Sequence, residues 1–169
     1  IQSLNIDASD FGGEKYEGCN EILNLSRPHI IKKIYEDYLK AGADIISTNS
    51  FAGSSITLAE YGLEEKDHEI NKAAAKLARE AANQFSTDDW PRFVAGSIGP
   101  TNKTISVTGN VTFEELEKAY YRQAEALIQG GVDILLLETV FDTLNAKAAF
   151  SAFEKLFAEK CTYPVILSA

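Results

Sequence analysis

The chain has 169 residues, of which 45% are hydrophobic and 24% charged, a composition typical of a globular protein with one core. Its formal net charge of −9, with 16 basic residues scattered among acidic ones, excludes the clustered basic surface that nucleic-acid binding requires. No stretch approaches the roughly 18 uninterrupted apolar residues of a membrane-spanning helix.

The first residues, IQSLNIDASD, lack the basic and apolar regions of a signal peptide. We therefore expect a cytoplasmic protein that binds neither nucleic acid nor a membrane. The chain contains no methionine, even at its first position, so we expect an excerpt of a longer protein. Cys19 and Cys161 are far apart and have no metal-binding spacing, which predicts two unremarkable thiols.

The predicted elements alternate between helices and strands after an irregular segment, residues 1–27. In chain order we predict a helix over Pro28 to Ala41, a strand over 43–51, a helix from about Glu65 to Phe85, a strand over 92–99, a helix over Phe113 to Gln129, a strand over 133–139, a helix from about Thr143 to Glu159, and a strand over 163–169. The strands are near-continuous runs of Val, Ile and Leu, which indicates parallel strands covered on both faces.

Local signals mark the ends of several helices. Ser26 is the predicted N-cap of the first long helix, with proline in its first turn and Gly42 as its stop. Thr112 and Glu115 have the spacing of a capping box, and the helix that they begin ends at the glycine pair 130–131. Asp142 can cap the last helix.

Two junctions resemble each other: KAGADIIS at 40–47 and QGGVDILL at 129–136. Each ends a helix with glycine, places an aspartate and enters an apolar strand. Such a repeated unit predicts an α/β fold with a parallel sheet. The pattern alone leaves open whether the sheet is flavodoxin-like or part of an eight-stranded barrel of about 250 residues.

Polar groups follow the predicted strands, and in parallel α/β proteins the carboxyl ends of the strands build the binding site. These groups are Thr48, Asn49 and Ser50 after the first strand, Ser97 after the second, and Glu138 and Thr139 after the third. Glu138 could hold a ligand's ammonium group or act as a base, in a pocket whose wall includes Phe51. The alternatives are a solvated Glu138 or one paired with a lysine, and a Phe51 that belongs to the core.

Four stretches, CNEILNLSRPHII, YLKAGADIISTNSF, VAGSIGPTNKT and ILLLETVFDTLNAKAA, resemble the homocysteine S-methyltransferase family over essentially the whole chain. Within it, the closest resemblance is to the homocysteine-binding module of cobalamin-dependent methionine synthase. The resemblance implies a partial (β/α)8 TIM barrel, with the second to fifth strands in a single incomplete domain over residues 1–169.

The resemblance also implies an activity: transfer of a methyl group to the sulfur of L-homocysteine, which forms methionine. Glu138 matches the family's glutamate that binds the amino group of homocysteine, and the TNSF stretch matches its substrate-side loop. Together with the polar groups that follow the predicted strands, this match gives the predicted substrate-binding residues: Asn49, Ser50, Phe51, Ser97, Glu138 and Thr139. We assign no catalytic or metal-binding residue within the chain.

The implied cofactors lie outside this chain. In the family, three cysteines bind a Zn²⁺ ion that activates the thiol, at positions past Ala169, and neither Cys19 nor Cys161 matches them. In methionine synthase, methylcobalamin and 5-methyltetrahydrofolate belong to other domains of the same protein. The methyl donor stays open between methylcobalamin, betaine and S-methylmethionine.

Two rival hypotheses remain at this stage. One is a catalytically silent barrel fragment that acts only by packing with another chain or with the rest of the protein. The other is an unrelated barrel enzyme, such as a phosphate-handling aldolase, which requires a glycine-rich phosphate loop after later strands.

Overall fold

The computed structural model describes residues 5–107 and 109–169. Four strands form one sheet: β1 (Ile45–Ser47), β2 (Phe93–Ile98), β3 (Ile134–Leu137) and β4 (Val165–Leu167). All neighbouring strands are parallel, and their order in the sheet is their order in the chain. The predicted α/β alternation is confirmed, although each strand is shorter than its apolar run.

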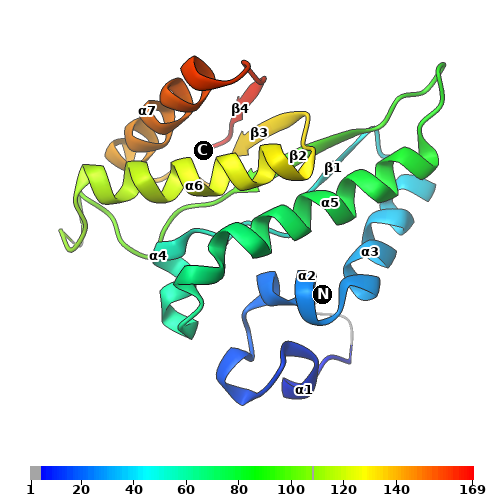
Figure 1. Cartoon of the computed structure of the whole chain (residues 1–169), viewed down its shortest axis with the longest axis horizontal. Helices are drawn as coiled ribbons and strands as arrows, with labels where there is room; N and C mark the ends of the chain where they lie inside the picture. Colours follow the sequence, from blue (N-terminus) through cyan, green and yellow to red (C-terminus); the bar gives the residue numbers. More distant parts are fainter. Residues whose placement is uncertain (1–4, 108) are drawn as a thin grey trace.

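Four long helices connect and cover the strands: α3 (Pro28–Lys40), α5 (Asp67–Phe85), α6 (Phe113–Gly130) and α7 (Thr143–Glu159). They pack in chain order, α3 on α5, α5 on α6 and α6 on α7, and form one layer over the sheet (Figure 1). Between the layers lie fully buried side chains such as Ile70, Leu127 and Leu135.

None of the described helices covers the other face of the sheet (Figure 1). Register places Ile45 beside Phe93, and Leu136 beside Ile166, on this face. Ile45, Phe93 and Ile166 are 46%, 41% and 42% exposed. The predicted coverage of both strand faces holds within β2, where residues 94–98 are all buried, but not at β1 and β4, which are exposed on this face.

Short helical segments fill the connections. They are α1 (Ala8–Phe11), η1 (Glu14–Tyr16), η2 (Asn20–Ile22), α2 (Leu23–Ser26), α4 (Ser55–Leu58), η3 (Ala59–Tyr61) and η4 (Glu64–Lys66). The segment predicted as irregular thus contains several helical turns, and its residues 1–4 lie outside the described residues. The single-domain organisation stays a prediction.

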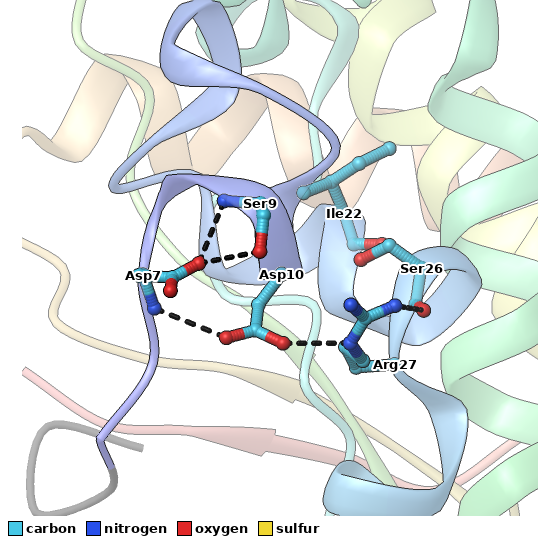
Figure 2. Close-up of polar contacts among 6 residues, drawn as sticks. All are labelled: Asp7, Ser9, Asp10, Ile22, Ser26 and Arg27. Carbon is cyan, nitrogen blue, oxygen red and sulfur yellow. Dashed lines mark hydrogen bonds and ion pairs between the residues drawn. The ribbon is translucent and has the colours of Figure 1, made fainter.

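The capping predictions have mixed outcomes. Thr112 and Glu115 form the predicted capping box, and Gly131 ends α6 in the left-handed conformation with φ 101°. Ser26, however, does not cap α3: Arg27 occupies the N-cap position without a side-chain cap. Ser26 is the last residue of α2, so its hydroxyl donates back to the Ile22 carbonyl at 3.3 Å (Figure 2).

Arg27 has a different role at this junction. Its Nε donates to Asp10 Oδ1 at 2.6 Å, and the other oxygen of Asp10 accepts the Asp7 backbone N–H at 3.0 Å (Figure 2). This ion pair ties α1 to the start of α3. The N-terminal segment is therefore fixed against the helical layer.

Asp142 caps α7 as predicted and also binds the preceding loop. Its carboxylate accepts the backbone N–H groups of Leu144 at 2.8 Å, Asn145 at 3.3 Å and Ser106 at 3.0 Å. Burial by itself raises the pKa of Asp142, but these N–H groups lower it overall.

We expect Asp142→Ala to lower the free energy of unfolding at pH 7 by about 2 kcal/mol. Because the folded-state pKa of Asp142 is lowered, the carboxylate's contribution is present above the unfolded pKa of about 3.9 and is lost as pH falls through the folded value. Urea unfolding at pH 7 and at lower pH should show that the difference in free energy of unfolding between variant and wild type becomes smaller as the pH falls. Asp88→Ala, at an exposed position, is the control. A difference in free energy of unfolding that does not change with pH contradicts the stabilising role of the Asp142 carboxylate.

Candidate functional site

Glu138 and Ser97 meet at the carboxyl ends of β3 and β2. Ser97 pairs in register with Leu136, so Glu138, two residues further along, faces the same side as Ser97. The Ser97 hydroxyl donates to Glu138 Oε1 at 2.5 Å. Ser97 is buried and Glu138 is half-buried. A charge-assisted bond of this kind fixes the orientation of the carboxylate.

The alternative interpretations of Glu138 can be compared with this geometry. The ion pairs found within residues 5–107 and 109–169 do not include Glu138, so a lysine partner is not seen there. A freely solvated side chain is also excluded, because Ser97 holds one carboxylate oxygen. The Glu138 carboxylate is therefore fixed and partly exposed at the strand ends.

A buried hydroxyl network joins the ends of β1 and β2. Ser50 Oγ donates to the Ser97 carbonyl at 2.7 Å and lies 2.6 Å from Thr48 Oγ1. Thr48 Oγ1 in turn accepts the Ser97 backbone N–H at 2.9 Å. These three residues are all buried. Ser50 thus lies behind the strand ends, where it fixes the backbone of Ser97.

Thr139, directly after Glu138, has a strained backbone. Its φ is 60°, and among the described residues it is the one non-glycine residue with positive φ. A β-branched side chain is disfavoured in this conformation, and such outliers cluster at functional sites. The following residue, Val140, donates its N–H to the Ser168 carbonyl at 3.1 Å, which holds the bend against the end of β4.

Phe51 and Asn49 point in different directions. Phe51 is 41% exposed, so its interpretation as a core residue is wrong. Its ring lies against Gly99, where a Cβ atom would stand only 2.7 Å from two ring carbons. The Asn49 side-chain nitrogen instead donates to the Asn20 carbonyl at 2.8 Å and to Asn24 Oδ1 at 3.2 Å, away from Glu138.

Sequence patterns did not predict the side chains that hold this region. Glu21 and Asn24 hydrogen-bond to the backbone of residues 49–53, as do Asn71 and Gln123. Their polarity together with their burial is the sign of this role. For Glu21 and Asn24, burial could not be inferred in a segment expected to be irregular, and for Asn71 and Gln123, on α5 and α6, the sequence did not show which groups they face.

A cavity of about 480 Å³ lies between α4, η4 and the start of α6. Its lining includes Lys103, Lys118 and Glu115, and none of the six predicted substrate-binding residues. The charges of this lining are mixed, so it favours neither an anion nor a cation. Ser97 and Glu138 instead share one face of the sheet, while Ser50 is buried and the Asn49 amide is bonded to the N-terminal segment.

The described residues of this chain do not fit a zinc site. Within the described parts of the chain, no three His, Cys, Asp or Glu side chains group around a common point. A cysteine binds zinc as the thiolate, whereas burial raises the pKa of the Cys19 thiol to about 11. Cys161 is exposed and precedes β4, at the opposite end of the strands from Glu138.

None of the described helices combines the length and the apolarity needed to cross a bilayer.

Comparison with known proteins identifies the family. The family model for homocysteine S-methyltransferase matches residues 2–169. The metallated form of the homocysteine methyltransferase MmuM from Escherichia coli aligns with 22% identity and a TM-score of 0.70, over 94% of this chain and 58% of that chain. Its apo form gives 22% identity and a TM-score of 0.66, over 97% and 57%.

At this identity, the likeness to MmuM shows the fold alone. The chain spans less than two thirds of the solved MmuM chain, and its four parallel strands with alternating helices correspond to part of a TIM barrel, as predicted. The family match excludes the unrelated aldolase-type enzyme. Since the family model covers all but the first residue, the chain belongs to the homocysteine S-methyltransferase family.

Proposed function

We propose that this chain is the homocysteine-binding part of a methyltransferase of the methionine synthase type, in which Glu138 receives the ammonium group of L-homocysteine. The observation that carries the proposal is the Glu138 carboxylate, held by Ser97 at the carboxyl edge of the sheet. Only Ser97 bonds to that carboxylate among the described residues. A ligand's ammonium group can therefore approach a carboxylate that is already oriented.

The other predicted residues take supporting roles in this proposal. Phe51 and Thr139 are exposed beside the strand ends and would line the pocket. Ser97 orients Glu138, and Ser50 fixes the backbone of Ser97. Asn49 contributes through its backbone position, because its amide group is bonded to the N-terminal segment.

The metal and the methyl donor are proposals that rest on the family. MmuM has been solved in a metallated form, which supports a zinc ion held by cysteines outside this chain. Bound Zn²⁺ lowers the pKa of a thiol from about 8.5, so that the sulfur is a thiolate at neutral pH. Folate and cobalamin domains of the same protein are proposed to supply the methyl group, and a cytoplasmic location stays a prediction.

The proposal can be tested with two ligands that differ in one group. L-homocysteine and 4-mercaptobutanoate share the thiol and the carboxylate, but only homocysteine has the ammonium group. We expect calorimetry on the full-length protein to show at least about ten-fold tighter binding of homocysteine. Mass spectrometry should detect methionine with the correct methyl donor. Equal affinity for the two ligands contradicts the proposed contact.

A second candidate, the catalytically silent fragment, is favoured by the exposed apolar face of the sheet at Ile45, Phe93 and Ile166. Size-exclusion chromatography of the 169-residue chain, with zinc analysis and methyl-transfer assays of the full-length protein, separates the two proposals. Stoichiometric zinc and methyl transfer in the full-length protein contradict the silent fragment. Association with another chain, without zinc or activity, supports it.

A further inference from the structure

Residues 49–53, called here the Phe51 loop, connect β1 to α4 and are held by side chains from both sides. On the N-terminal side, Asn24 Nδ2 donates to the Asn49 carbonyl at 2.7 Å. Glu21 Oε1 accepts the Ala52 backbone N–H at 2.9 Å. Both residues come from the short helical turns of residues 20–26.

On the helix side, two buried amides complete the arrangement. Gln123 Nε2 donates to the Ser50 carbonyl at 2.8 Å, and Asn71 Nδ2 donates to the Gly53 carbonyl at 2.7 Å. The four side chains thus satisfy carbonyl and N–H groups that no neighbouring strand pairs. A loop held in this way has one conformation rather than several.

Glu21 differs from the other three because it is an acid. It is only 6% exposed, and the ion pairs within the described residues give it no cation. Burial raises the pKa of its carboxyl group. The titratable groups whose pKa is influenced by the charge of Glu21 are Cys19 and Tyr61. Neither of them carries a positive charge.

The bond from Ala52 to Glu21 lies next to the exposed aromatic ring. The Phe51 carbonyl accepts the Gly99 backbone N–H at 2.9 Å, and the Phe51 ring covers Gly99. The backbone of Phe51 is therefore fixed on one side by Gly99 and on the other, one residue later, by Glu21. Loss of either contact frees the peptide that sets the direction of the ring.

We propose that Glu21 is a positioning residue for homocysteine binding: by accepting the Ala52 N–H, it holds Phe51 against Gly99 beside the strand ends. The proposal rests on the proposed function of this site. Glu21 itself does not touch the ligand. The loop requires the acceptor oxygen of Glu21 rather than its charge, because no cation from residues 5–107 or 109–169 pairs with it.

Two substitutions in the full-length protein separate the acceptor from the charge. Glu21→Ala removes the acceptor, and we expect the dissociation constant of homocysteine to rise about ten-fold, with kcat at saturating homocysteine changed less than about two-fold. Glu21→Gln keeps a carbonyl oxygen for Ala52, so its dissociation constant should rise by no more than about two-fold. Glu17→Ala, an exposed glutamate in the same segment, is the matched control and should behave as wild type.

Hydrogen exchange supplies a readout that does not depend on homocysteine. A peptide covering the Phe51 loop should exchange faster in Glu21→Ala than in wild type, and at the wild-type rate in Glu21→Gln. If Glu21→Ala does not fold, Glu21→Met takes its place, since it fills the volume without a comparable acceptor.

The inference is overturned if the variant without an acceptor keeps wild-type affinity and exchange, or if Glu21→Gln weakens binding as much as Glu21→Ala. If instead the proposed function fails, the same experiments give a different set of results. In that case Glu138→Gln leaves homocysteine affinity unchanged, while loss of the Glu21 acceptor still accelerates exchange in the Phe51 loop.

Discussion

Replacing Glu138 by glutamine is expected to weaken homocysteine binding by the full-length protein about ten-fold to a hundred-fold. The amide oxygen of glutamine can still accept the bond from Ser97, so the local fold is retained. What disappears is the negative charge that pairs with the ammonium group of the ligand. A charge-assisted hydrogen bond contributes about 1.5–3 kcal/mol, which corresponds to this range.

The ligand pair and a second variant make this result specific. Affinity for 4-mercaptobutanoate, which lacks the ammonium group, should be nearly the same in wild type and Glu138→Gln. Glu154→Gln removes the same charge from an exposed position on α7 and should leave both affinities unchanged. Calorimetry at constant ionic strength measures all six combinations of protein and ligand. Wild-type affinity of Glu138→Gln for homocysteine removes the proposed role of this carboxylate.

The largest effect on stability is expected from Arg122→Met. Asp67 is fully buried, and its carboxylate accepts bonds from Arg122 Nε at 2.8 Å and Nη2 at 2.5 Å. Removing the arginine leaves a buried carboxylate without its cation. We expect the free energy of unfolding to fall by about 3 kcal/mol, at the lower end for a buried pair because the Arg122 side chain is 40% exposed.

Urea unfolding at neutral pH measures this change, with Lys33→Met as the control. Lys33 pairs with Asp37 on the surface of α3, where both side chains are more than half exposed. An exposed pair of this kind contributes less than about 1 kcal/mol. Equal losses in the two variants contradict the view that burial of Asp67 makes its pair important.

The Asp67–Arg122 pair also bears on the site. Asp67 begins α5 and Arg122 lies on α6, so the pair joins these two helices. The Asp67 carbonyl accepts a bond from Asn71, whose amide also holds Gly53. Weakening the pair therefore loosens the helix side of the Phe51 loop together with the fold.

Local signals predicted the helix ends that depend on a few neighbouring residues. The bond between Thr112 and Glu115 and the cap of α7 by Asp142 link residues two or three positions apart. Their geometry follows from backbone dihedrals common to all helices. Ser26 does not cap α3, because it is the last residue of the short helix α2. Nothing in the sequence of residues 23–26 signalled that helix.

The sequence by itself determined the α/β alternation, most helix limits and, through its resemblance, the family and the candidate role of Glu138. Only the tertiary structure decided which groups meet at the strand ends. The Ser97–Glu138 bond joins residues 41 positions apart, and the Glu21–Ala52 bond joins residues 31 positions apart. Hydrophobic periodicity reports which face of an element is buried. It does not report which distant polar group pairs across the core, because that pairing depends on how the elements pack.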